Sequence, residues 1–412
     1  MARRSPLADH WPLDPDIVFL NHGSYGACPT AVLAAQRSWQ DRMEREPVRW
    51  FGDDLEPALD QARRRVARFL NAEPDDLAFV RNATTGVNTI LRALRFQPGD
   101  RILAADHEYN AVLNAASYAA ARDGAALDVA ALPFPVDGPE QSIERILDAV
   151  RPRTRLVVLS AITSPTAVVM PIVELAHALT TRGLEILVDG AHAPGQVPVD
   201  IGALEAAGVS YWTGNAHKWL CAPKGSGILW VRRDRQPAIR PLTISHGAND
   251  ERADRSRYRL EFDWMGTDDW SAPLSIPAAL DVMAGFVSDG WPEIMARNHA
   301  LAIGGRDLVC DRLGIEPPTP ETMLGAMAAI PLPVDPAASR ARSPLDHDPL
   351  QVALMDRHRI QVPIGPWPTA WTPGRSRSQP TGRLLRISAQ LYNSLGAYEL
   401  LADGLAELLP AR

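Results

Sequence analysis

One aspartate and one lysine stand where a carboxylate and an amine can act on the same ligand. The apolar run at 184–188 ends in Asp189, and the apolar run at 209–211 is followed by a small-residue turn and then Lys218. Ligands of open α/β sheets bind at the ends of strands, so both side chains are expected at one sheet edge. An aspartate against a pyridine nitrogen and a lysine able to form an imine are the protein groups that pyridoxal phosphate (PLP) chemistry requires.

The neighbours of this pair fit the same chemistry, although each also has a simpler interpretation. Most lysines lie at the surface, but a desolvated lysine near positive groups has a lowered pKa and becomes a nucleophile. His192, shortly after Asp189, is either a turn cap or a hydrogen-bond partner of the phenolic oxygen of a pyridoxal ring. Tyr109 follows a predicted strand and is either a core or rim residue or an aromatic stacked on the ring.

Arg386 stands in an otherwise apolar predicted strand at 384–388. A buried arginine needs a partner, and a substrate carboxylate matches its two-pronged geometry. A structural salt bridge explains the residue equally well.

Small and hydroxyl residues follow the short apolar stretch at 79–80, where a helix is predicted to begin. They include Thr84 and Thr85. The free N–H groups of a first helical turn, and the positive end of the helix dipole, attract phosphate. A plain N-cap accounts for one threonine just as well. The glycine-bracketed segment 19–26 is likewise either a tight turn or a backbone open to a ligand or a neighbour.

Alternating strand and helix patterns from about residue 78 to 232 predict an α/β layer with a mostly parallel sheet. The expected strands are 79–80, 102–105, 127–132, 156–159, 184–188, 209–211 and 228–231. The expected helices are 31–46, 55–69, 83–94, a helix ending near 122, 142–150 and 173–181. Within the second helix, the run of Arg63, Arg64 and Arg65 is interpreted as a solvated face.

The pattern changes after residue 231. Residues 232–260 are interpreted as an irregular surface or inter-subunit segment, and a helix at 276–287 leads out of a large domain. The remaining expected elements are a helix through 313, an apolar stretch at 327–332, a helix at 350–359, the strand at 384–388 and a helix at 396–409. The loop 361–382 is typical of a lid or binding loop, in which Trp367 and Trp371 either form an apolar pocket or pack the loop.

Three regions follow from this pattern. Residues 1–45 are expected to form an N-terminal arm and helix that contribute to the small domain and the active site. Residues 46–285 form a large cofactor-binding domain, and residues 286–412 form a small C-terminal domain.

Composition excludes several classes of function. The chain has 412 residues, 46% hydrophobic and 22% charged, with a net charge of −7 and no concentrated basic face, which argues against a general nucleic-acid binder. No apolar run approaches the roughly 20 residues that span a bilayer, and no apolar segment follows the N-terminal arginines. Three scattered cysteines favour neither a disulfide framework nor a metal site. We expect a cytoplasmic enzyme with a small-molecule substrate.

Seven short segments in a fixed order, spread over about residues 19–393, together carry a family resemblance. They are LNHGSYG at 20–26, NATTGVN at 82–88, DHEYNAVL at 106–113, VDGAHAPG at 188–195, GNAHKWLCAPKGSG at 214–227, GTDD at 266–269 and LRISAQLYN at 385–393. This set resembles the class V aminotransferase family of fold-type I PLP enzymes, and within it the isopenicillin N epimerase-like branch. The resemblance implies a three-layer large domain around a mostly parallel sheet, plus a smaller α+β domain.

The resemblance also implies a role for each site residue. Lys218 forms the imine with the cofactor, Asp189 pairs with the pyridine nitrogen, His192 contacts the ring oxygen and Tyr109 stacks on the ring. The residues implied for the phosphate are Thr84, Thr85, Asn215, His217 and, from the second subunit of a homodimer, Thr267. Arg386 is implied to bind the substrate α-carboxylate, with Asn21 nearby.

One departure from the family narrows the function. Cysteine desulfurases of the family carry a nucleophilic cysteine in the loop before the arginine strand, and here the loop 361–382 has none. The resemblance therefore implies an enzyme that removes the α-proton of an amino acid held as an external aldimine, with Lys218 as general base. Epimerisation is favoured, and C–S elimination and transamination are the alternatives.

Two readings from other classes of protein are weaker. A non-catalytic PLP-fold binding module is disfavoured because no DNA-binding domain is visible in the sequence and both Asp189 and Lys218 are present. A nucleotide-binding α/β enzyme would show a G-x-G-x-x-G or P-loop pattern, which the sequence lacks.

Overall fold

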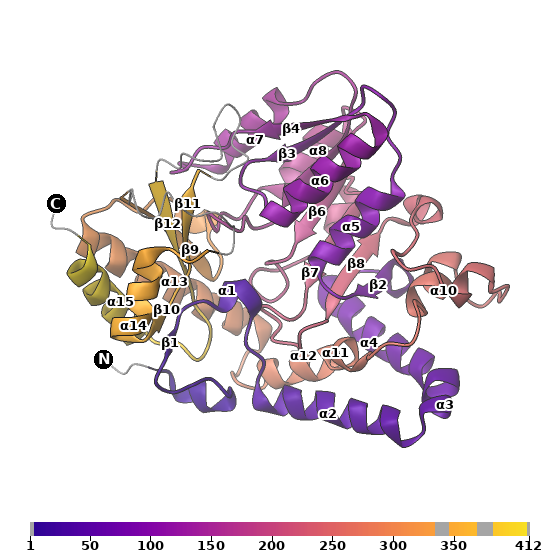
Figure 1. Ribbon diagram of the computed structural model, residues 1–412, viewed down its shortest axis with the longest axis horizontal. Coiled ribbons are helices and arrows are strands. Elements are labelled where there is room, and N and C mark those ends of the chain that lie inside the picture. Colours follow the sequence, from indigo (N-terminus) through magenta and orange to yellow (C-terminus); the bar gives the residue numbers. More distant parts are fainter. Residues whose placement is uncertain (1–3, 334–345, 369–381, 410–412) are drawn as a thin grey trace.

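A computed structural model of the chain describes residues 4–333, 346–368 and 382–409. A large sheet covered by helices on both faces fills one part of the molecule, and a second, smaller sheet with its own helices lies beside it (Figure 1). The architecture is α/β, as the sequence predicts.

The large sheet contains seven strands in the described ranges, in the order β2-β8-β7-β6-β5-β3-β4. Neighbours from β7 to β4 are parallel, whereas β8 runs antiparallel to both β7 and β2. The strands are β2 (Leu77–Val80), β3 (Arg101–Ala105), β4 (Ala126–Ala130), β5 (Thr154–Ser160), β6 (Glu185–Gly190), β7 (Tyr211–Asn215) and β8 (Gly227–Val231). Because the central strands are parallel, their carboxyl ends meet at one edge of the sheet.

Each strand of this sheet packs its alternate residues into two different cores. In β5, Val157 and Leu159 belong to one apolar cluster, and Leu156 and Val158 belong to the other. The second cluster is covered by α5 (Ala83–Ala93), α6 (Asn110–Asp123) and α10 (Arg257–Asp263). The first is covered by α2 (Thr30–Arg45), α4 (Leu55–Leu70), α7 (Pro139–Asp148), α8 (Ile172–Thr180), α9 (Ile201–Ala206), α11 (Ser271–Leu274) and α12 (Ile276–Ala284). Burial on both faces explains why these strands read as continuous apolar runs.

The smaller sheet is antiparallel, and it brings the two ends of the sequence together. Its strands are β11 (Ile364–Trp367), β12 (Gly382–Ser388) and β9 (Met327–Leu332), in that order. Beside it, β1 (Val18–Phe19) pairs in parallel with β10 (Ile360–Gln361). A separate apolar cluster joins this region to α13 (Trp291–Leu313), α14 (Pro349–His358) and α15 (Leu395–Leu408). The predicted division into the regions 1–45, 46–285 and 286–412 stays a prediction.

Short elements complete the described chain. They are η1 (Pro6–His10), α1 (His22–Tyr25), α3 (Pro47–Arg49), η2 (Trp50–Asp54), η3 (Pro74–Asp76), η4 (Arg233–Ala238), η5 (His246–Asn249) and η6 (Glu321–Met323). The predicted arm at 1–18 and the predicted irregular segment at 232–260 therefore contain helical turns.

Two predicted segments differ most from the structure, and many other predicted boundaries shift by a few residues. The strand expected at 209–211 begins at Tyr211 and continues to Asn215, paired with β6 and β8. Its small residues look like a turn in the sequence, but Gly214 is required because a Cβ there would come within 2.4 Å of the Trp212 ring. The loop expected at 361–382 contains β11, and Trp371 lies outside the described residues.

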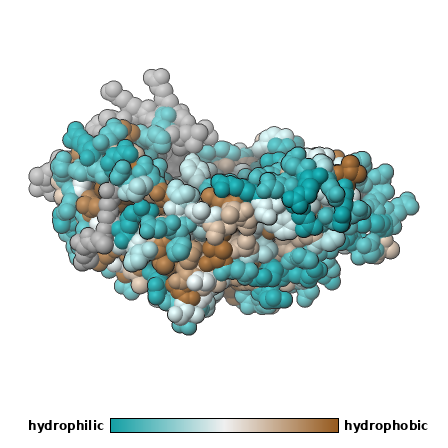
Figure 2. Space-filling model, turned by 90° about the horizontal axis from the view of Figure 1, so that it is seen from below, coloured by the Kyte–Doolittle hydropathy of each residue, from teal (hydrophilic) through white to brown (hydrophobic). Residues whose placement is uncertain are grey.

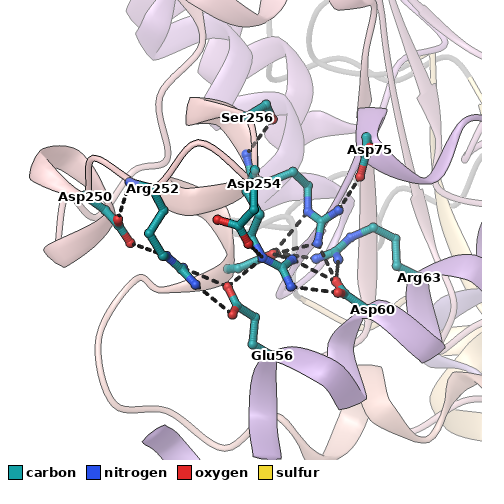
Figure 3. A network of polar contacts seen from close by, with 11 residues as sticks. Glu56, Asp60, Arg63, Asp75, Asp250, Arg252, Asp254 and Ser256 are labelled. Atoms are coloured by element: carbon teal, nitrogen blue, oxygen red, sulfur yellow. Dashed lines mark hydrogen bonds and ion pairs between the residues drawn. The ribbon is translucent and has the colours of Figure 1, made fainter. Parts of the chain in front are cut away.

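The solvated arginine face predicted on α4 is wrong for Arg63. Its side chain is 1% exposed, donates to the Leu77 carbonyl at 3.1 Å and pairs with Asp60 at 2.8 Å and with Asp263. The acids and arginines of this network come from α4, η3, α10 and the segment leading into α10 (Figure 3). The burial of Arg63 depends in part on Asp263, 200 positions away, so periodicity within one helix does not reveal it.

The surface has no extended apolar face on the side seen in Figure 2, where hydrophilic residues enclose small apolar patches. Among the described residues, no helix combines the length and apolar character needed to cross a membrane.

Replacing Arg63 with Met should strongly destabilise the fold, because Asp263 would lose one of its buried partners. Breaking a buried ion pair costs about 3–5 kcal/mol. The matched control is Arg65→Met on the same helix, whose pair with Asp281 is exposed at 39% and 62% and should contribute under about 1 kcal/mol. Urea titration of both variants measures the difference, and equal losses would contradict the assignment.

Candidate active site

The predicted lysine and aspartate lie at the same edge of the large sheet. Asp189 is the penultimate residue of β6, between Ser160 of β5 and Thr213 of β7 in the strand register. Lys218 lies in the turn that follows β7, and its Nζ is 3.1 Å from His192 Nε2. The parallel order of β5, β6 and β7 thus brings together residues that the sequence separates.

The environment of Lys218 favours an uncharged amine. Desolvation is the main cause that lowers its pKa to about 7, and the positive charge of Arg386 lowers it further. The negative charge of Asp189 raises the pKa of Lys218, but this does not cancel the lowering by burial and by Arg386. Near neutral pH a large fraction of this amine is therefore a free base and a nucleophile.

Asp189 is 4% exposed and accepts a hydrogen bond from the Ala191 N–H at 2.9 Å. Burial raises the pKa of its carboxyl, whereas the Ala191 N–H and the charge of Lys218 lower it. A buried carboxylate of this kind needs a positive partner. A protonated pyridine nitrogen would supply that charge.

Arg386 enters the site from β12 of the smaller sheet. Its Nη1 donates to the Ser164 carbonyl at 2.6 Å, and its Nη2 donates to Ser24 Oγ at 3.1 Å. Asn21 accepts from the same Ser24 hydroxyl at 2.5 Å, so it reaches Arg386 through one intermediate. Burial lowers the pKa of Arg386 to about 10, although the electrostatic interaction with Tyr109 raises it. The guanidinium is held in place without a described carboxylate partner, which argues against a structural salt bridge.

The start of α5 lies beside β7, and side chains accept from two of its first N–H groups. Asn82 caps the helix by accepting from the Thr85 N–H at 2.9 Å, and Asn215 accepts from the Ala83 N–H at 2.8 Å. Gly86 allows the close approach, because a Cβ there would lie 2.1 Å from Thr213 Oγ1. Thr84 stands between the two capped positions, in the first turn of α5.

Three buried nitrogen atoms of the site have no partner within the described part of the chain. They are His192 Nδ1, His217 Nδ1 and Arg386 Nε. Burial is also the main cause that lowers the pKa of His217 to about 4 and the pKa of His192 well below its ordinary value. Unpaired buried nitrogens around one lysine fit a ligand with several oxygen atoms. Together with Asp189 and the hydroxyl residues at the start of α5, this donor set fits pyridoxal phosphate.

Two predicted residues lie at the margin of this arrangement. Tyr109 directly precedes α6 and is 49% exposed, so one side of the ring is open to a ligand. Thr267 lies on an exposed loop between α10 and α11, where the adjacent Asp268 pairs with Arg81 at 2.7 Å. Nothing within this chain places Thr267 against Lys218, and its contact from a second subunit stays a prediction.

Sequence reasoning missed Glu108. Its buried carboxylate accepts from the Ser160 N–H at 3.0 Å and from the Ser160 hydroxyl, directly beside Asp189 in the register. Desolvation raises its pKa to about 8, and the charge of Asp189 contributes. The only available signal was its place between His107 and Tyr109 at a strand end. The segment 20–26 also contributes more than a turn, since Ser24 holds Arg386.

Comparison with known proteins identifies the family of the chain. The family model "Aminotransferase class-V" matches residues 26–286. Isopenicillin N epimerase of Amycolatopsis lactamdurans is 33% identical over 410 residues, covering 96% of both chains. A probable chloroplastic L-cysteine desulfhydrase of Arabidopsis thaliana is 31% identical over 411 residues, covering 96% of this chain and 84% of the relative.

Solved structures support the fold. A cysteine desulfurase from Escherichia coli superposes with a TM-score of 0.74 at 20% identity, covering 98% of each chain. The cystine C–S lyase C-DES, in complex with cysteine persulfide, gives a TM-score of 0.75 at 21% identity over 96% of this chain and 99% of that one. Because the family model matches more than half of the chain and two relatives match 96% of it, the chain belongs to the aminotransferase class V family and is a pyridoxal-phosphate-dependent enzyme.

Proposed function

We propose that the protein removes the α-proton of an amino-acid substrate and inverts its α-centre, as an isopenicillin N epimerase-like enzyme. The observation that carries the proposal is the buried cluster of Lys218, His192 and Arg386, with Nζ of the lysine 3.1 Å from the histidine. It places a weakly basic amine and a carboxylate-binding guanidinium in one site.

The residues fit a division of labour around the cofactor. Asp189 would hold the pyridine nitrogen, the start of α5 with His217 would hold the phosphate, and Tyr109 would cover the ring. When bound, pyridoxal phosphate supplies an electron sink that acidifies the α-proton of an attached amino acid. We also propose that Thr267 of a second subunit contacts the phosphate of the cofactor. The enzyme would then be a homodimer.

Arg386 would orient the substrate by its α-carboxylate. Its Nη atoms are held by Ser164 and Ser24, and its Nε is the buried nitrogen without a described partner. A guanidinium fixed in this way presents a rigid fork to a carboxylate. The substrate is then anchored at one end while Cα faces the lysine.

Lys218 would take the α-proton. A general base works best when its pKa lies near the operating pH, and the pKa of Lys218 is lowered to about 7. Inversion requires that a proton return to the opposite face of Cα. Elimination instead requires that a substituent leave Cβ after the same proton transfer.

The relatives include both epimerases and lyases, so they support inversion and elimination alike. Isopenicillin N epimerases of two organisms match at 33% and 31% identity, over 96% of each relative. The L-cysteine desulfhydrase of Arabidopsis thaliana named above is 31% identical, and a putative one from rice is 30% identical. A cysteine C–S lyase is therefore the second candidate.

Persulfide transfer by a protein thiol has no support. All three cysteines of the sequence, Cys28, Cys221 and Cys310, are buried. Burial raises the pKa of the Cys28 thiol to about 12 and that of Cys310 to about 11. A reactive cysteine is partly exposed and has a lowered pKa.

Incubation with isopenicillin N in D2O tests the proposal. We expect deuterium at Cα and the epimer as product, measured by mass spectrometry and chiral chromatography. Parallel incubation with L-cysteine, with assays for sulfide, pyruvate and ammonia, tests the lyase candidate. Release of these products without epimer formation would replace the first proposal with the second, and no α-exchange in either substrate would reject both.

Lys218→Ala should abolish α-exchange, a loss of at least about 1,000-fold if the amine is both nucleophile and base. The sequence holds two lysines, Lys218 and Lys224, so Lys224→Ala is the matched control. Lys224 donates to the Gly26 carbonyl at 3.1 Å, away from the proposed chemistry, and its variant should keep most activity. Full exchange in Lys218→Ala would contradict the assignment.

The rate at which cofactor-free protein takes up pyridoxal phosphate should depend on pH. Because only the neutral amine reacts, and the pKa of Lys218 is lowered to about 7, the rate should rise with pH and level off above about 7. Stopped-flow absorbance measures it. Arg386→Gln removes a charge that lowers this pKa, so its midpoint should move to higher pH. A rate that keeps rising toward pH 10 would indicate an ordinary lysine.

A further inference from the structure

His22 is a buried histidine between two polar groups at the back of the Lys218 turn. It belongs to α1, is 0% exposed, and lies at the start of the segment 20–26. Its Nε2 is 3.0 Å from the Lys218 carbonyl oxygen, and its Nδ1 is 2.8 Å from the Tyr392 hydroxyl. The proposed reaction gives His22 no role.

The chemistry of the three groups fixes the direction of these hydrogen bonds. A carbonyl oxygen only accepts, so Nε2 of His22 carries a proton and donates to Lys218. Burial lowers the pKa of His22 to about 3, so the ring is neutral and has a single N–H. Nδ1 must then accept, and the Tyr392 hydroxyl donates to it. Burial also raises the pKa of Tyr392, which keeps that proton in place.

The turn that receives this hydrogen bond is strained and tightly enclosed. The Lys218 carbonyl also accepts from the Cys221 N–H at 3.0 Å, and Cys221 has a φ of 57°, which residues with a side chain rarely adopt. Gly26 packs on the other side, where a Cβ would lie 2.0 Å from the His217 carbonyl oxygen. The Lys218 backbone is therefore set by contacts from outside its own turn.

We propose that His22 is a positioning residue for Lys218, with Tyr392 selecting the histidine tautomer that donates to the Lys218 carbonyl. The inference rests on the proposed function through the role given to Lys218. Holding the peptide of Lys218 fixes where its side chain starts, and so keeps Nζ beside His192. The hydrogen bonds from Tyr392 to His22 and from His22 to Lys218 connect the segment after β12 with the turn after β7.

The same short segment also reaches Arg386. Ser24, in α1 with His22, accepts from Arg386 Nη2 at 3.1 Å. One helical turn thus touches both the backbone of the proposed base and the side chain of the proposed carboxylate clamp. Nε2 of His22 also lies 3.8 Å from Cys221 Sγ. A histidine that only filled space would need its packing on Trp219, at 4.8 Å between ring centroids, but not its contacts with the Lys218 carbonyl and the Tyr392 hydroxyl.

Three variants separate positioning from packing. In His22→Gln the longer amide can place a donor where Nε2 stood, whereas in His22→Asn the shorter amide reaches only the Nδ1 position. Tyr392→Phe removes the hydroxyl that selects the tautomer and keeps the ring. All three variants retain a side chain of similar size or a polar group. Their thermal unfolding midpoints, compared with that of the wild type, show whether the fold is intact.

The first readout needs no cofactor. Cofactor-free protein is labelled with trace acetic anhydride over a range of pH, and peptide mass spectrometry follows Lys218, with Lys224 as the internal reference. We expect His22→Gln to keep the wild-type labelling midpoint. The midpoint of His22→Asn should rise by about one pH unit, because a displaced amine is better hydrated.

The second readout is turnover of the loaded enzyme. We expect kcat to fall about tenfold or more in His22→Asn, about two- to threefold in Tyr392→Phe and less than twofold in His22→Gln, with KM nearly constant. Wild-type behaviour of His22→Asn, or equal losses in His22→Asn and His22→Gln with an unchanged Lys218 midpoint, would overturn the inference. Failure of the proposed function would appear as full α-exchange in Lys218→Ala. That measurement is separate from those on the His22 and Tyr392 variants, so the two failures are distinguishable.

Discussion

The site depends on keeping the amine of Lys218 uncharged inside the protein. Burial and the nearby positive charge of Arg386 both disfavour the ammonium form, and Asp189 only partly opposes them. The same low-polarity surroundings keep His192 and His217 neutral. A site with several buried nitrogen atoms and little compensating negative charge is costly when empty. That cost is the physical reason why the donor set fits an anionic cofactor and a substrate carboxylate.

The two sheets supply the two halves of this arrangement. Parallel strands β5, β6 and β7 place Asp189 and the Lys218 turn at one edge, because their carboxyl ends coincide. Arg386 comes from β12 of the other sheet, and it is tied back to the large sheet through the Ser164 carbonyl in the loop after β5. The site therefore exists only where the two sheets meet, which no single stretch of sequence encodes.

Much of this could be predicted from local patterns, and the remainder could not for identifiable reasons. Asp189 and Lys218 follow apolar runs, so their strand-end positions are visible in the sequence, and the buried Arg386 stands out in its apolar strand. Arg63 and Glu108 were missed because their burial depends on partners far away in the chain, Asp263 and Ser160. Propensity describes a residue and its neighbours along the chain, whereas ion pairing describes neighbours in space.

The segment 20–26 shows how a motif can be structural and functional together. His22 holds the peptide of Lys218, Gly26 fits against the His217 carbonyl, and Ser24 holds Arg386. The proposed base and the proposed carboxylate clamp would have to act on one substrate at a fixed separation, but they belong to different sheets. A rigid element that contacts both residues keeps their separation from varying, and proximity in catalysis depends on such fixed geometry. The turn and the ligand-site interpretations of this segment are therefore two aspects of one role.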